Sequence, residues 1–200
     1  MNTLVATSAA MLGWLLVERI RDGHATTLGA ASGIVAGLVA ITPACSSVSP
    51  LGAIAIGAIT GAVCALAVSL KYKFGYDDSL DVVGVHLVGG VMGTLLIGLF
   101  ASSAAPAGVD GLFYGGGLDQ LWRQAVGAGA VLVYSFVLSL VLALLVKAVV
   151  GFRVSAEDEA VGIDETEHAE TAYHFGDGRS VRRSPVPADE VERKLEGSRA

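Results

Sequence analysis

The chain has 200 residues, of which 53% are apolar and only 16% are charged, and its formal net charge is −6. Ordinary soluble domains carry about 25% charged residues, so this composition excludes that class and indicates an integral membrane protein. Residues 151–200 hold 12 Asp or Glu against 7 Lys or Arg, so most of the net charge lies in a soluble C-terminal tail.

Stretches without charged residues predict the membrane-spanning helices. A helix that crosses hydrocarbon needs about 20 apolar residues. Residues 25–70 contain no Asp, Glu, Lys or Arg, and the prolines and serines of residues 42–50 divide them into two spans. The fold class is therefore an all-α membrane protein. In chain order we expect five transmembrane helices, near residues 2–20, 25–44, 50–71, 79–101 and 121–150.

These helices define the expected domains. Residues 1–152 form the membrane domain, and residues 153–200 form a tail that we expect to be disordered after about residue 176. The first stretch has no Lys or Arg before Arg19, whereas a signal peptide begins with positive residues. We therefore interpret it as a membrane helix that begins abruptly.

The basic residues between the helices indicate the orientation. Six of them fall on one side of the predicted membrane, and only Arg123 falls on the other. Because cytoplasmic loops are enriched in Lys and Arg, we expect a multi-pass plasma-membrane protein with its N-terminus outside and its tail in the cytoplasm. The six residues are Arg19, Arg21, Lys71, Lys73, Lys147 and Arg153.

Ionisable residues near the start of the fourth helix are candidate functional groups. Asp77 and Asp78 are explained as helix caps. His86 lies about two turns inside a charge-free run, where an ionisable side chain usually faces a cavity or a partner. The alternative is a packed histidine that bonds to a carbonyl of another helix. In an α-helix Asp81 lies roughly 140° from His86, so we expect it to hold neighbouring groups instead.

Glycines recur at four-residue spacing in three of the predicted helices. Such spacing lets helix backbones approach closely in lipid. It predicts a tight bundle, and both a narrow pore and ordinary membrane packing agree with it. The glycines are Gly29, Gly33, Gly37, Gly57, Gly61, Gly89 and Gly93.

Several kinds of chemistry lack their motifs in this sequence. There is no HExxH zinc pair, no G-x-S-x-G nucleophile elbow, no phosphate-binding loop and no dinucleotide fingerprint. We therefore expect no metal, no cofactor and no enzymatic activity. Nucleic acid is not an expected partner, because no basic stripe with interleaved aromatic residues occurs.

Three separated segments carry a family resemblance when they are considered together. They are Leu12-Gly13-Trp14 followed by residues 29–39 and Thr42-Pro43-Ala44-Cys45; Asp81-Val82-Val83-Gly84-Val85-His86; and Gly162-Ile163-Asp164 with residues 168–173. In this order and spacing they resemble the ammonium transporter (Amt/Mep/Rh) family, in its bacterial and archaeal Amt branch. The resemblance extends from residue 1 to about residue 175.

The resemblance implies a fold and a function. Family members have eleven membrane helices in an inverted repeat, form trimers with one pore in each subunit, and transport ammonium. The ion gives up its proton, ammonia crosses an apolar pore, and paired histidines of the fifth and tenth helices help to conduct the proton. His86 matches the tenth-helix histidine and Asp81 the aspartate at its cytoplasmic end. With Val82 and Thr42 they are the expected pore residues.

The tail also resembles the family. Its cytoplasmic segment couples the subunits and, in many members, meets PII-type signalling proteins. The family commonly has a glycine where this chain has Ala169. The tail residues that we carry over as regulatory are Gly162, Asp164, His168, Glu170 and Tyr173.

The resemblance covers only the seventh to eleventh helices, without the fifth-helix histidine, the outer recruitment site and the aromatic gate. We therefore expect a partial transporter that contributes one histidine of the pore pair. It would be a gene fragment, a product of a misplaced start or half of a split protein. Its expected partners are ammonium or ammonia, the lipid bilayer, and either two further copies or the missing half. The alternative is a non-conducting fragment that binds full-length subunits or a PII-type regulator through its tail.

Overall fold

The fold comes from a computed structural model that describes residues 1–171. The described residues are helical and contain no strand, which confirms the all-α prediction. They belong to two compact units, Met1–Leu142 and Ala143–Ala200. In chain order the elements are α1 (Asn2–Arg21), α2 (Thr27–Ala44), α3 (Pro50–Ala67), α4 (Leu70–Phe74), the π-helix η1 (Val82–Leu87), α5 (Val88–Phe100), the 3₁₀ turn η2 (Leu112–Tyr114), α6 (Asp119–Val149), α7 (Ala156–Val161) and α8 (Ile163–Thr166).

Five helical stretches of the described chain are long and apolar enough to cross a membrane, in agreement with the predicted fold class. The fourth begins at Val82 and not near residue 79, because its first residues form a π-helix after a left-handed residue, Asp81. The division of the chain at residues 152/153 stays a prediction, as does disorder after about residue 176, which lies outside the described residues. The five stretches are Asn2–Arg21, Thr27–Ala44, Pro50–Phe74, Val82–Phe100 and Asp119–Val149.

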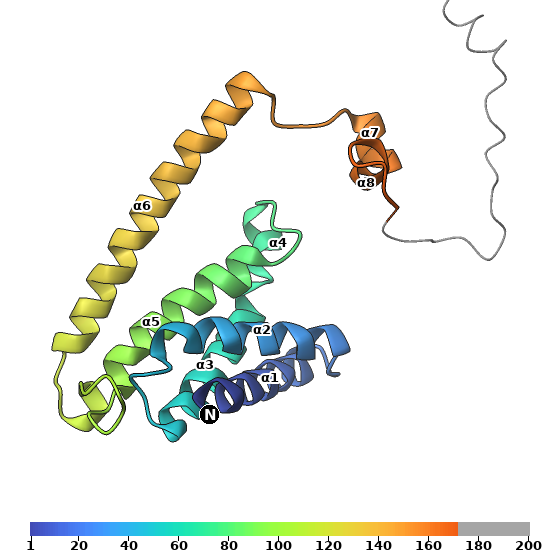
Figure 1. Cartoon of the computed structure of the whole chain (residues 1–200). Coiled ribbons are helices and arrows are strands. Elements are labelled where there is room, and N and C mark those ends of the chain that lie inside the picture. The colour runs from blue at the N-terminus through green and yellow to red at the C-terminus, as the bar shows by residue number, and fades with distance from the viewer. Residues whose placement is uncertain (172–200) are drawn as a thin grey trace, which may run out of the picture. The chain divides into compact units, whose positions relative to one another are not determined.

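Helix α1 packs against both α2 and α3, and these helices lie alongside one another in Figure 1. Glycines make the contact possible. A Cβ atom on Gly37 would lie 2.7 Å from the Cβ of Ala10, and a Cβ on Gly61 would overlap the Ala10 carbonyl oxygen. The predicted tight bundle is therefore present, and small residues bring its backbones together.

Helix α5 completes this bundle by packing on α2 and α3. Gly93 faces the backbone of Ala40, so α5 and α2 also approach at a glycine. The apolar core between α1, α2, α3 and α5 includes Ile41 and Ile56, both of which are almost fully buried. This bundle of α1, α2, α3 and α5, called the wall below, carries the π-helix η1 at the N-terminal end of α5.

Helix α6 differs from the other spans, because none of its residues is buried within the chain. It is nevertheless apolar all round, with leucines, valines and aromatic residues that are exposed over much of its length. A helix of this composition is stable only where lipid or other protein covers it.

Candidate functional site

The candidate site begins at the loop between α4 and η1. Asp78 is buried in this loop, and its carboxylate accepts the backbone N–H groups of Val82, Val83 and Gly84 at 2.7, 3.0 and 3.3 Å. It therefore satisfies the first amide groups of the π-helix, which would otherwise be unpaired. The predicted cap is confirmed for Asp78.

The same prediction is wrong for Asp77. Its side chain is exposed, and its Oδ1 atom accepts a hydrogen bond from the Ser79 hydroxyl at 3.1 Å. Two neighbouring aspartates thus have different roles, because the turn of the loop directs only Asp78 toward the helix amides.

Asp81 adopts the left-handed conformation, with φ 56° and ψ 31°, directly before the π-helix. A residue with a side chain rarely takes this conformation, although Asp tolerates it better than most. Because η1 is a π-helix and Asp81 lies outside it, the α-helical rotation of roughly 140° between Asp81 and His86 does not apply here. The Asp81 carboxylate forms an ion pair with Lys71, with 2.7 Å between the Lys71 Nζ atom and the Asp81 Oδ1 atom.

His86 lies in the π-helix and is exposed on its surface. Gly84 and Val85, in the same π-helix, are buried. A Cβ on Gly84 would lie 2.9 Å from the Cα of Val68, so the π-helix rests directly on the end of α3. The imidazole consequently stands on an open face of the wall within a membrane-spanning stretch.

The other two predicted pore residues, Thr42 and Val82, line one broad groove of about 960 Å³. Both side chains are exposed, and the Thr42 hydroxyl donates to the Leu38 carbonyl at 2.6 Å. Segments of α2, η1, α5 and α6 form the groove, and its surface is mostly apolar. His86 and Asp81 do not line it, so the described chain brings together only two of the four predicted pore residues.

Sequence reasoning overlooked a second buried carboxylate, Glu18, near the end of α1. Its oxygens accept the Trp14 indole N–H at 3.1 Å, the Thr26 backbone N–H at 2.8 Å and the Thr26 hydroxyl at 3.1 Å. The group is only 8% exposed. The sequence does contain a signal for the Trp14–Glu18 contact, because the two residues are four apart and residues i and i+4 share a helix face.

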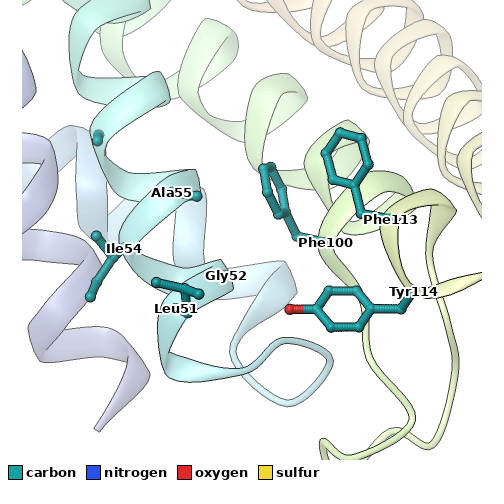
Figure 2. Close-up of a pocket in the computed structure, with 8 residues that line it drawn as sticks. Leu51, Gly52, Ile54, Ala55, Phe100, Phe113 and Tyr114 are labelled. Atoms are coloured by element: carbon teal, nitrogen blue, oxygen red, sulfur yellow. The ribbon is translucent and has the colours of Figure 1, made fainter.

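A separate hollow lies on α3, α5 and η2 and contains none of the predicted site residues. Figure 2 shows Phe100 and Phe113 on one side of it and the Tyr114 hydroxyl directed toward Leu51 and Gly52. The two phenyl rings meet edge to face, with their centroids 5.2 Å apart. The hollow has a volume of about 450 Å³ and an apolar lining.

Four of the five predicted tail residues fall in the described region. Gly162, at φ 119°, separates α7 from α8, and the Glu170 backbone N–H donates to the Asp164 carbonyl at 2.8 Å. His168 is exposed beside this turn. Tyr173 lies outside the described residues. Within residues 1–171 no group of His, Cys, Asp and Glu side chains has the arrangement of a metal site.

Comparison with known proteins places these features in a family. A family model described as Ammonium Transporter Family matches residues 1–173. The chain is 66% identical over 180 residues to an ammonium transporter of Mycobacterium tuberculosis, with 87% of this chain and 38% of the relative covered. It is 47% identical over 174 residues to an ammonium transporter of Bacillus subtilis, with 86% and 43% covered.

Solved structures agree with the sequence comparison. Saccharomyces cerevisiae Mep2 superposes with a TM-score of 0.69 at 36% identity, over 78% of this chain and 37% of Mep2. A protein described as a sensor Amt protein gives a TM-score of 0.72 at 32% identity, over 82% of this chain and 40% of that protein. The chain spans about two fifths of the length of the curated relatives that it matches. This chain belongs to the ammonium transporter family.

Proposed function

We propose that the chain forms one wall of a transmembrane pathway for ammonium, with His86 as its member of the pore histidine pair. The observation that carries the proposal is the exposure of His86 on a membrane-spanning stretch. Exposing an ionisable side chain to lipid costs several kcal/mol, so such residues face a cavity or another protein segment. The relatives described as ammonium transporters supply the identity of the substrate.

The chemistry of imidazole suits this role. A neutral histidine has one donor and one acceptor nitrogen, so a histidine pair can line an apolar passage without a fixed positive charge. It also exchanges protons near neutral pH, which fits a substrate that crosses as ammonia and a separate proton. Val82 and Thr42 line a separate apolar groove of the same wall, and we propose that Asp81 stands at the cytoplasmic end of the passage.

The proposed pathway needs protein opposite His86. We propose that transporter helices outside this chain supply the opposite wall and the second histidine, and that the assembly is a trimer in the bilayer. The unburied, apolar surface of α6 supports the presence of further protein or lipid around the wall. The positions of the basic residues support an external N-terminus and a cytoplasmic tail.

A second proposed role concerns the tail, which would bind full-length subunits or a PII-type regulator. Its support lies in the described part of the tail, where Gly162 separates α7 from α8 and the Glu170 N–H donates to the Asp164 carbonyl. In this role the chain need not conduct ammonium by itself.

Methylammonium uptake in a transporter-deficient strain tests the first proposal. One arm produces this chain alone. The other produces a completed transporter, in which this chain replaces the matched part of the M. tuberculosis relative. We expect uptake from the completed transporter and none from the chain alone, with His86→Ala reducing uptake by about 100-fold or more because it removes a proton carrier. Normal uptake by His86→Ala at equal protein amounts would contradict the pore role.

A further inference from the structure

The loop before His86 contains an arrangement that neither the capping carboxylate nor the pore explains. Asp81 holds a left-handed backbone that disfavours residues with side chains. Such a conformation persists where surrounding groups hold it in place. The residue that contacts both the Asp81 side chain and the neighbouring backbone is Lys71 of α4.

Lys71 bonds to two points of the loop. Its Nζ donates to the Asp81 Oδ1 atom at 2.7 Å and to the Asp78 carbonyl oxygen at 3.0 Å. The Lys71 side chain is only 15% exposed and that of Asp81 is 34% exposed, so the ion pair is partly shielded from water. Nζ also lies 5.4 Å from the centroid of the Tyr72 ring. Charge-assisted bonds from one ammonium group to two loop residues restrict both of them.

The restrained loop sets the geometry of the π-helix. The Asp78 carbonyl is held by Lys71, while the Asp78 carboxylate accepts three amide groups of η1. The Asp81 carbonyl accepts the N–H of Val85, one residue before His86. A π-helix is a rare alternative to the α-helix and is often found at functional sites. Changing the backbone at Asp81 would therefore change the direction in which His86 leaves the helix.

We propose that Lys71 is a positioning residue: its ammonium group locks Asp78 and Asp81 together, and this lock holds the π-helix that orients His86. The proposal rests on the pore role of His86 for its effect on transport. Its structural part, the dependence of the π-helix on Lys71, can be measured independently of transport.

The chain offers a matched control in Lys73. It lies in the same short helix and carries the same charge, but its Nζ is placed over the Phe74 ring, at 5.8 Å from the centroid. Lys71→Met and Lys73→Met therefore remove the same charge, but only Lys71→Met removes the hydrogen bonds to Asp78 and Asp81. Lys71→Arg keeps the charge and donor groups.

Hydrogen exchange of residues 77–87 in the completed transporter tests the lock directly. We expect Lys71→Met to speed amide exchange of Val82, Val83 and Gly84 by about tenfold, because the loop that pairs them is released. Lys73→Met should leave the exchange unchanged, and Lys71→Arg should restore most of the protection. Equal exchange in Lys71→Met and Lys73→Met would overturn the proposal.

A double-mutant comparison tests whether Lys71 acts through Asp81. Asp81→Asn removes the carboxylate charge and tolerates the left-handed conformation. If the pair acts as a unit, adding Lys71→Met to Asp81→Asn should change the exchange by less than about twofold. A further tenfold increase in the double variant would show that Lys71 acts through its bond to the Asp78 carbonyl and not through Asp81, and would overturn this assignment.

Methylammonium uptake supplies the functional readout. We expect Lys71→Met to reduce uptake about tenfold at equal protein amounts, since a misplaced catalytic group lowers rates by one to two orders of magnitude. Lys71→Arg should recover most of the rate, and Lys73→Met should retain it. Full uptake by Lys71→Met despite faster exchange would overturn the link to His86. If the completed transporter without any substitution takes up no methylammonium, the proposed function is contradicted. The hydrogen-exchange result would still show whether Lys71 holds the π-helix in place.

Discussion

Glu18 is a carboxylate buried within the membrane bundle, and three hydrogen bonds explain how it is tolerated there. Its partners are the Trp14 indole and both donors of Thr26, which starts the next helix. The group therefore links the end of α1 to the beginning of α2. A Cβ on Gly29 would overlap the Glu18 carboxylate, so a side chain at this position on α2 would displace the carboxylate from its partners.

Replacing Glu18 should destabilise the bundle. Glu18→Ala leaves three donors without their acceptor, and we expect a loss of about 3 kcal/mol in the free energy of unfolding. Glu18→Gln keeps one acceptor oxygen and should lose about half as much. Thermal unfolding in detergent measures both changes. The control is Asp22→Asn at the exposed neighbouring loop, and equal unfolding temperatures for Glu18→Ala and this control would refute the linking role.

Ala169 is the second residue with a side chain in the left-handed conformation, at φ 54°. The resemblance to the family places a glycine here, and glycine adopts this conformation without strain. We expect Ala169→Gly to stabilise the turn by about 1 kcal/mol. Slower amide exchange at Glu170, whose N–H bonds to the Asp164 carbonyl, would report the gain.

Helical Ala160 provides the opposite control. Glycine within a helix is unfavourable, so Ala160→Gly should weaken α7 by about 1 kcal/mol. If both substitutions speed exchange in the tail, the left-handed turn at Ala169 is not the source of strain.

At the scale of the elements, α1 is held between α2 and α3 by glycine contacts. The regular glycine spacing in the sequence indicated which helix faces pack, because residues four apart share one face. It did not indicate which helix each face meets. That pairing follows from the tertiary arrangement, in which Gly37 of α2 and Gly61 of α3 both meet Ala10 of α1.

A single added methyl group tests this packing. Gly61→Ala places a Cβ against the Ala10 carbonyl oxygen, and we expect a loss of about 2 kcal/mol in stability. Gly127→Ala is the matched control, because open space surrounds Gly127 on α6 and alanine favours the helix by about 1 kcal/mol. Detergent unfolding of the two variants should shift in opposite directions. A stable Gly61→Ala variant would contradict the close approach.

The fourth membrane-spanning stretch shows where prediction from sequence stopped. Charge-free apolar residues predicted a helix, and acidic residues predicted a cap, both from local patterns. The π-helix η1 and the left-handed Asp81 depend on Lys71, ten residues earlier in the chain. No periodicity encodes this contact, because it requires the end of α3 and α4 to lie beside the loop.

At the scale of the whole molecule, orientation across the membrane can be tested with the two native cysteines. Cys45 is exposed at the end of α2, whereas Cys64 is buried in α3, and both are free thiols. With the proposed orientation, a membrane-impermeant maleimide should label Cys45 in intact cells. Cys45→Ser should abolish labelling, since burial protects Cys64. Labelling that requires permeabilised cells would reverse the proposed topology.

The amino-acid sequence by itself determined the fold class, the five apolar spans, the likeness to ammonium transporters and His86 as a residue to examine. These features rest on local composition, periodicity and short motifs, which are encoded along the chain. Only the tertiary structure decided that Asp78 and not Asp77 caps the π-helix, that Lys71 holds Asp81, and that Glu18 joins two helices. Hydrogen bonds need donors and acceptors within about 3 Å, and only folding brings such groups together.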